Sequence, residues 1–334
     1  MKKNHPKRSR QYLFRASAVG LAAALLFDGF VTGASAAYIF TTLDNPLGTT
    51  GTAASGISGS TVVGYYRDSS SVLHGYSYNG STFTTVDDPL GTKGTSANGI
   101  DGSTIVGYYL DSSSHSHGFS YNGSTFTTLD DPLAGPNGTR AFGVSGSNIV
   151  GYYQPDLTGS RHGFIYNGST YTTLDHPLAG PQGTTALAIS GSTIVGFYWD
   201  SSGRDHGFSY NGSTYTTLDA PLAGPVGSGA NGISGSTILG GYTDSSGLQH
   251  GYLYDGVSYT TFDDPLGITG TETGGIWGTT VVGSYFSSGR HGFIAVQTVP
   301  EPGCLALARV ALVSLGGWWL IHRRRSRAPS ASYT

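Results

Sequence analysis

Histidine is the first residue type here with the chemistry for a functional site, because a His-Gly pair occurs six times. The histidines are His74, His117, His162, His206, His250 and His291. Zinc needs three or four ligands within about 2.1 Å of one ion. Successive pairs lie 43, 45, 44, 44 and 41 residues apart, so equivalent positions in separate repeats would form a wide ring instead of converging. We therefore predict no metal site, and a hydrogen-bonding role for each histidine at the start of a strand.

Aspartates form a second candidate set, in the polar segments that precede most of these histidines. They are Asp68, Asp111, Asp200 and Asp244. Carboxylates suit calcium, but an aspartate can equally cap its own turn by accepting hydrogen bonds from N–H groups two residues on. The "DSSG" pattern lacks the ligand spacing of a calcium loop, so we expect turn caps, with at most weak, diffuse Ca²⁺ binding and no cofactor. Trp199 precedes Asp200 and could stack on a sugar ring. These five residues are the candidate glycan or cation contacts.

Catalysis has little support in the sequence. No serine lies in a nucleophile-elbow pattern. Two carboxylates could hydrolyse a glycosidic bond, but the aspartates recur with the repeat, whereas an active site should break the symmetry. Residues without counterparts in the other repeats include Arg140, His176, Glu272 and Trp277. We predict no catalytic residues. A polysaccharide-acting enzyme, a glycosidase or a lyase, is the alternative.

The elements that must position these residues are short strands in a repeat of about 44 residues. The second repeat contains four strand-like pieces, at 97–100, 103–109, 117–123 and 124–130, rich in Val, Ile, Thr, Tyr and Phe. An Asn-Gly pair separates the last two, which is typical of a two-residue hairpin turn with positive φ at both residues. Because no helical periodicity is visible, the chain is predicted to be all-β in this region.

One copy of the repeat is divided between the two ends of the domain. Residues 38–44, "YIFTTLD", match only a fourth strand, and residues 272–296 match only the first three strands. Blades of four strands around a central channel form a β-propeller, and pairing the two part-copies would close the ring. We predict a six-bladed β-propeller over 37–298, closed by an N-terminal strand. An open solenoid, the alternative, would need atypical capping repeats.

Charge and cysteine content describe the domain further. Residues 37–300 contain 18 acidic and 6 basic residues, a net charge of −12. Such a surface repels nucleic acid, and there is no basic stripe for it to follow. The single cysteine, Cys304, lies outside the repeats, so packing and strand pairing must hold the domain together without a disulfide.

The two ends have the composition of targeting segments. Residues 1–36 combine basic residues, the apolar run "ASAVGLAAALLF" and the small residues "ASA", which predicts a secretory signal peptide. Residues 299–327 contain a Pro-Glu-Pro, about 18 mostly apolar residues and an arginine cluster, which predicts a membrane helix with a cytoplasmic C-terminal side. Residues 328–334 are a short tail.

Two known families resemble parts of this chain. The repeats resemble the HAF family of extracellular bacterial repeats, with His-Gly-Phe in place of His-Ala-Phe. The C-terminus resembles a PEP-CTERM sorting signal, whose motif residues here are Val299, Pro300, Glu301, Pro302, Arg323, Arg324 and Arg325. This resemblance implies a Gram-negative envelope, removal of the signal by an exosortase after signal peptidase has acted, and an association with exopolysaccharide and biofilm matrix.

The expected function follows from these features together. We expect an exported, non-enzymatic structural or binding propeller that is anchored transiently in the inner membrane. It would then be sorted to the cell surface or the extracellular matrix. Its expected partners there are exopolysaccharide or other surface proteins, and the sequence names no particular ligand.

Overall fold

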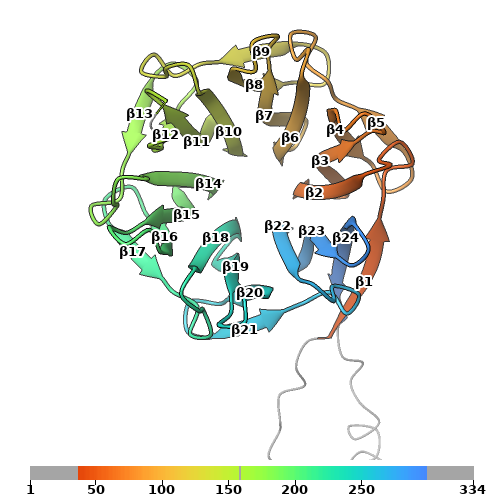
Figure 1. Cartoon of the computed structure of the whole chain (residues 1–334), viewed down its shortest axis with the longest axis vertical. Helices are drawn as coiled ribbons and strands as arrows, with labels where there is room; N and C mark the ends of the chain where they lie inside the picture. The colour runs from red at the N-terminus through yellow and green to blue at the C-terminus, as the bar shows by residue number, and fades with distance from the viewer. Residues whose placement is uncertain (1–36, 158, 299–334) are drawn as a thin grey trace, which may run out of the picture. The chain divides into compact units, whose positions relative to one another are not determined.

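The computed structural model describes residues 37–157 and 159–298, which form six four-stranded blades around a central channel (Figure 1). The described part contains 24 strands and no helix, so none that could span a membrane. The all-β, six-bladed prediction is confirmed. The predicted signal peptide (1–36), the sorting signal with its membrane helix (299–327) and the tail (328–334) lie outside the described residues.

Each blade runs from an innermost first strand to an outer fourth strand. The first strands are β2 (Gly51–Ser58), β6 (Gly94–Asp101), β10 (Gly138–Ser145), β14 (Thr184–Ser190), β18 (Gly227–Ser234) and β22 (Thr271–Trp277). The second strands are β3 (Thr61–Arg67), β7 (Thr104–Leu110), β11 (Asn148–Gln154), β15 (Thr193–Trp199), β19 (Thr237–Thr243) and β23 (Thr280–Phe286). The third strands are β4 (Leu73–Tyr78), β8 (Ser116–Tyr121), β12 (His162–Tyr166), β16 (Asp205–Tyr210), β20 (Gln249–Tyr254) and β24 (Arg290–Gln297). The fourth strands are β5 (Phe83–Thr85), β9 (Phe126–Leu129), β13 (Tyr171–Leu174), β17 (Tyr215–Leu218), β21 (Tyr259–Phe262) and β1 (Tyr38–Leu43). Blades are numbered 1 to 6 in the order of their first strands.

Blade 6 combines the two ends of the domain, as predicted. Its strand order is β1-β24-β23-β22, and β1 pairs antiparallel with β24 from Tyr38 opposite Gln297 to Leu43 opposite Gly292. The Tyr38 and Phe40 rings reach the neighbouring blade, where their centroids lie 4.8 and 5.1 Å from that of Phe262. The N-terminal strand therefore closes the sheet of blade 6 and the packing between blades 5 and 6.

Neighbouring blades are joined by single parallel pairs of residues at the start of the third strand. Leu73 pairs with Gly94, Arg161 with Gly183, and Asp205 with Gly227. These contacts connect blades 1 and 2, 3 and 4, and 4 and 5. The residue before each histidine therefore lies next to the first strand of the following blade.

The hairpin between the third and fourth strands differs from the predicted two-residue turn. In blade 2 the loop spans four residues, Asn122 to Thr125, because Tyr121 pairs with Phe126. Only Gly123 has a positive φ, of 95°. Asn122 Oδ1 accepts from the backbone N–H groups of Ser124 and Thr125, at 3.0 and 2.9 Å. The asparagine side chain caps the loop, and within it only the glycine adopts a positive φ.

The core lies between blades, where apolar side chains of one sheet contact those of the next. The largest fully buried side chain of each third strand occupies the same position: Tyr76, Phe119, Phe164, Phe208, Tyr252 and Phe293. Opposite each lies a glycine of the second strand. At Gly107 a Cβ would lie 1.9 Å from the Ser96 carbonyl oxygen and 2.9 Å from the Phe119 ring. This close approach explains the glycine of the recurring "VGY" pattern.

The first strands carry a β-bulge in their middle. In β6 the register shifts between Ala97 and Gly99, and Asn98 is the extra residue. Its counterparts are Ser55, Phe142, Leu187 and Asn231, and they line the channel. Asn98 Nδ2 donates to the Ala141 carbonyl oxygen at 2.8 Å, and Asn231 Nδ2 donates to that of Thr273 at 3.1 Å. These two side chains tie neighbouring first strands together.

Candidate functional site at the channel mouth

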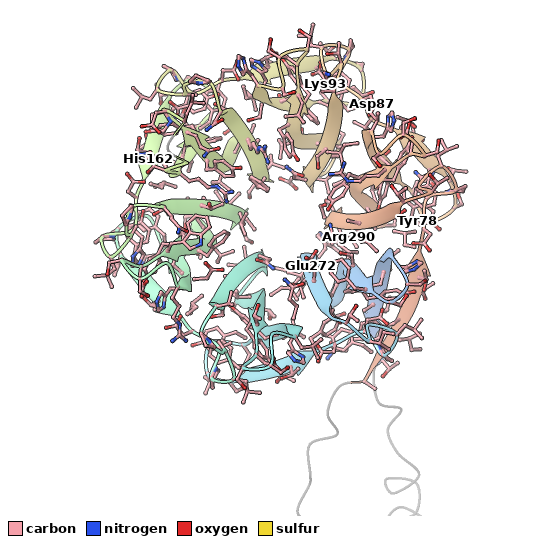
Figure 2. The ribbon with its side chains drawn as sticks, viewed as in Figure 1. Tyr78, Asp87, Lys93, His162, Glu272 and Arg290 are labelled. Atoms are coloured by element: carbon pink, nitrogen blue, oxygen red, sulfur yellow. The ribbon has the colours of Figure 1, made fainter. Side chains whose placement is uncertain are left out.

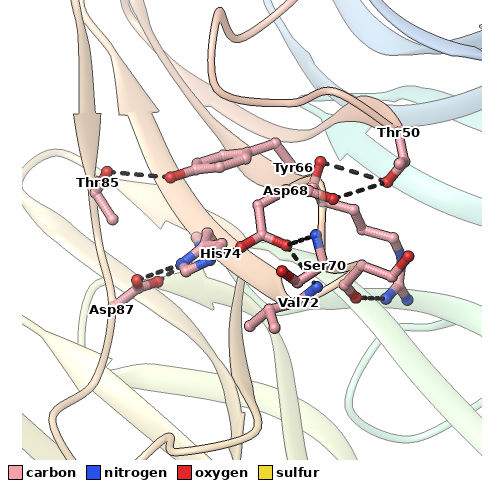
Figure 3. Close-up of polar contacts among 11 residues, drawn as sticks. Thr50, Tyr66, Asp68, Ser70, Val72, His74, Thr85 and Asp87 are labelled. Carbon is pink, nitrogen blue, oxygen red and sulfur yellow. Dashed lines mark hydrogen bonds and ion pairs between the residues drawn. The ribbon is translucent and has the colours of Figure 1, made fainter.

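In blades 1, 2, 4 and 5, each repeated histidine contacts two aspartates, and Figure 3 shows the unit of blade 1. His74 Nδ1 lies 2.7 Å from Asp87 Oδ2, and its Nε2 lies 3.6 Å from Asp68 Oδ2. Asp68 Oδ1 accepts from the backbone N–H groups of Ser70 and Val72, at 2.8 and 2.9 Å. The unit thus fixes the loop after the second strand to the loop after the fourth strand.

The same histidine contact occurs in all six blades. The other Nδ1 partners are Asp130, Asp175, Asp219, Asp263 and Asp44, at 2.8 to 3.0 Å. In blade 6 the bond joins His291 to Asp44, which precedes the rest of that blade by more than 200 residues. The histidines therefore act at strand starts, as predicted. Within the described residues, no group of three or more His, Cys, Asp or Glu side chains is placed to hold a metal ion.

Electrostatics agree with turn capping by the predicted aspartates. Hydrogen bonds lower the carboxyl pKa of all four aspartates. For Asp68 the main donor is the Val72 backbone N–H, and for Asp111 it is that of His115. For Asp200 and Asp244 the main donors are the hydroxyl groups of Ser202 and Ser246. Burial alone would lower the pKa of His250, but its bonds to Asp263 and Asp244 raise it overall. These carboxylates already serve as acceptors inside the protein.

Trp199 ends β15 and is only partly exposed. The Arg161 guanidinium lies 5.0 Å from its ring centroid, and the edge of Phe197 lies 4.8 Å away. Trp199 does not line the channel pockets described below. The structure therefore places this predicted glycan contact beside Arg161, outside the lining of these two pockets.

The channel has two different ends. The tight-turn end, formed by the turns between first and second strands, is a cavity of about 250 Å³ lined by nearly equivalent residues of every blade. Several of its polar groups link successive blades: Ser58 Oγ accepts from Gly102 N at 3.1 Å, and Asp101 Oδ2 from Gly146 N at 2.7 Å. Two aromatic side chains in its lining, Phe142 and the 53% exposed Trp277, are exceptions to this repetition. The similar residues of successive blades at this end therefore serve to join neighbouring blades.

The opposite end, the channel mouth, opens among the long loops and is asymmetric. One cross-strand pair per blade lies there: Ala53–Tyr65, Ser96–Tyr108, Arg140–Tyr152, Thr185–Phe197, Gly229–Gly241 and Glu272–Ser284. The pairs bring aromatic rings to blades 1 to 4, two glycines to blade 5, and the charged Glu272 with Ser284 to blade 6. A pocket of about 310 Å³ lies at this end, and Arg67, Arg140 and Arg290 are among its lining residues.

On the blade 6 side of the mouth, Arg290 connects two blades, and Figure 2 shows it with Glu272 at the inner rim. One guanidinium nitrogen donates to Glu272 Oε2 at 2.5 Å, and the other donates to the Tyr65 hydroxyl of blade 1. Ser284 Oγ donates to the same carboxylate oxygen at 3.4 Å. This network holds a charged pair and an aromatic ring in place at the pocket wall.

Across the channel, Arg140 of blade 3 lacks such a partner. Its guanidinium carbon lies 4.2 Å from the centroid of the Tyr108 ring. Its Nε is buried without a hydrogen-bond partner, and Arg140 forms no ion pair among the described residues. Buried polar groups normally have partners, so Arg140 is a charged donor with unused hydrogen-bonding capacity at the pocket.

A second cavity, of about 420 Å³, adjoins the mouth beside blade 5 and shares Glu272 and Asn231 with it. The Gly229–Gly241 pair leaves this space open, because the other blades place side chains there. Asp205 also lines it, and burial raises the pKa of its carboxyl to about 6, although His206 and Arg161 lower it in part.

Only some residues of the mouth stand out in the sequence. Arg140 and Glu272 break the repeat, as predicted, and the structure places both at the channel mouth. Tyr65, Tyr108 and Arg290 were missed. Comparing the six residues that follow the glycine of "VGY" would have revealed the sequence Tyr, Tyr, Tyr, Phe, Gly, Ser, and therefore the asymmetry.

Comparisons with known proteins returned structural similarities only. No family model and no curated protein matches the chain. A lectin of Aleuria aurantia in complex with Fucα1-6GlcNAc superimposes with a TM-score of 0.49 at 14% identity, covering 76% of this chain and 93% of the lectin. The Trypanosoma rangeli sialidase in complex with the inhibitor DANA gives 0.49 at 10% identity, covering 80% of this chain and 57% of the sialidase. The propeller assignment here rests on the chain's own strand pairing.

Proposed function

We propose that this protein is an exported, non-enzymatic binding propeller that holds a saccharide at its channel mouth. The observation that carries the proposal is the asymmetric pocket of about 310 Å³, with Tyr65, Tyr108, Arg140, Glu272 and Arg290 in its lining. Sugar rings bind to aromatic faces flanked by a few fixed polar groups. The Arg290–Glu272 pair supplies donors and acceptors that are already held in position.

The place where both ends of the described chain leave the domain is consistent with a binding site at the channel mouth. Tyr38 and Gln297 pair at the tight-turn end of blade 6, so both ends of the described chain leave the domain there. While the predicted C-terminal segment holds the domain at the inner membrane, the channel mouth would face away from that membrane and stay accessible to a saccharide. Processing by signal peptidase and an exosortase belongs to the same proposal.

A glycan array tests this proposal, using the purified protein, Tyr108→Ala and Trp277→Ala. We expect Tyr108→Ala to weaken saccharide binding by about tenfold, since aromatic contacts contribute about 0.5–1.5 kcal/mol beyond area burial. Trp277→Ala removes an exposed aromatic residue at the other end of the channel and should bind normally. Thermal melts of both variants serve as the folding control. Binding that is lost in Trp277→Ala and retained in Tyr108→Ala would place the site at the wrong end.

A glycosidase or lyase is the second candidate, because Asp205 and Glu272 line one cavity. Glycoside hydrolysis needs one protonated and one ionised carboxyl group. Burial gives Asp205 a pKa of about 6, and Arg290 pairs with Glu272. Release of reducing ends or unsaturated sugars from a polysaccharide panel, abolished in both Asp205→Asn and Glu272→Gln, would establish this activity. Products formed equally by wild type and both variants would exclude these carboxyl groups.

A further inference from the structure

We infer that the saccharide held at the channel mouth is acidic, and that Arg140 binds its carboxylate. This inference rests on the proposed function and names the ligand class. Residues 37–300 have a net charge of −12, yet three of their six basic residues line the mouth pocket. Glu272 is the single acidic residue in that lining. The interior of the mouth is therefore basic within an otherwise acidic domain.

Of the three arginines, Arg140 is the one available to a ligand. Arg290 bonds to Glu272 and Tyr65, and Arg67 donates to the Ser71 carbonyl oxygen at 3.0 Å. Arg140 rests on Tyr108, which restricts its side chain, and has a buried Nε without a partner. A planar guanidinium can bind a carboxylate through two parallel hydrogen bonds. An incoming carboxylate would pair with the two terminal guanidinium nitrogens of Arg140, which form no hydrogen bond or ion pair with any described residue.

The opposite wall suits the rest of a sugar. The first strands β10 and β22, which carry Arg140 and Glu272, lie across the channel from each other (Figure 1). A uronate whose carboxylate meets Arg140 would direct its hydroxyl groups toward the Arg290–Glu272 pair. Glu272 accepts from hydroxyls but would repel a carboxylate placed on its own side, so the pocket also fixes the direction of the ligand.

The acidic residues of the domain do not compete for Arg140. The aspartates after the fourth strands, such as Asp87 and Asp130, are held by histidine Nδ1. The loop aspartates Asp68, Asp111, Asp200 and Asp244 accept hydrogen bonds from backbone N–H groups of their own loops. Figure 2 shows Asp87 at the outer edge, far from the inner rim where Glu272 and Arg290 lie. Lys93 also lies at the outer edge, which makes it a matched control for loss of one positive charge.

The test compares uronate-containing oligosaccharides with their carboxyl-reduced, neutral counterparts by titration calorimetry. Charge-assisted hydrogen bonds contribute about 1.5–3 kcal/mol, so the wild type should bind at least one acidic member ten- to hundredfold more tightly than its neutral form. Arg140→Gln should abolish that difference and leave neutral binding unchanged. Arg140→Lys should keep part of it, since it retains the charge and loses the planar fork. Lys93→Gln should bind as wild type.

Two results would overturn the inference. One is that no acidic oligosaccharide binds more tightly than its reduced counterpart; binding of neutral forms at the mouth would then leave the proposed function standing. The other is an equal loss in Arg140→Gln and Lys93→Gln, which would indicate a general charge effect. Absence of binding to any saccharide, acidic or neutral, would instead refute the proposed function itself.

Discussion

The hydroxyl of Tyr252 gives the sharpest test of the packing between blades. Four of the six equivalent third-strand positions hold phenylalanine, and two hold tyrosine. The Tyr76 hydroxyl donates to the Ala53 carbonyl oxygen at 3.1 Å. The Tyr252 hydroxyl is buried with no hydrogen-bond partner, and a Cβ on Gly240 would lie 2.4 Å from it. Removing each hydroxyl should therefore have opposite effects on stability.

The expected changes in the free energy of unfolding follow from the cost of burying a polar group without a hydrogen-bond partner. Tyr252→Phe should stabilise the fold by about 1 kcal/mol, because an unsatisfied buried hydroxyl costs about 1–3 kcal/mol. Tyr76→Phe should destabilise it by about 1 kcal/mol, the typical net contribution of a hydrogen bond. In a domain of this size each change moves Tm by about 2–4 °C. Thermal melts followed by circular dichroism measure both variants, and a fall in Tm for Tyr252→Phe as large as that for Tyr76→Phe would refute the reasoning.

Three further predictions concern closure, pH and sorting. Deleting residues 38–47 removes β1 and should lower Tm by more than 10 °C and cause aggregation, since it exposes the edge of β24; an unchanged melt would exclude a closed ring. Burial, and secondarily the charge of His206, lower the pKa of His176 to about 4. Its neutral form therefore stabilises the fold above the unfolded pKa of about 6.5, and that stability is lost as pH falls toward 4. Urea melts at pH 7 and 4.5 should show a smaller acid loss in His176→Asn than in wild type, and equal losses would exclude His176 as the cause. Replacing Pro300, Glu301 and Pro302 with alanine should leave export intact and cause precursor to accumulate in the inner membrane, as seen by fractionation and immunoblotting; secretion at the normal mature size would contradict the sorting prediction.

Repetition explains why the ring was predictable from sequence. Each blade solves the same packing problem, so Gly107 and its equivalents, the histidines and the hairpin asparagines recur at a fixed period. The division of one copy between residues 38–44 and 272–296 has a simple explanation only if the ring closes. These features depend on local sequence and on the twofold alternation of strands.

The channel mouth could not be located in the same way. A bulge in each first strand shifts the alternation at Asn98 and its equivalents, so residues on either side of it do not follow one twofold pattern. The bulge residues themselves, Ser55, Asn98, Phe142, Leu187 and Asn231, share no common side-chain chemistry. The informative position was two residues earlier, at Ser96 and Arg140, and its aromatic partners became apparent only through cross-strand pairing.

Saccharide binding at the channel mouth would be visible in a crystal structure of the protein with a bound acidic oligosaccharide. We expect sugar density in the pocket at the mouth, with a carboxylate within hydrogen-bond distance of the Arg140 guanidinium and hydroxyl groups near the Arg290–Glu272 pair. Density at the tight-turn end, or in the grooves between blades at the outer edge, with the mouth free of sugar, would contradict this expectation.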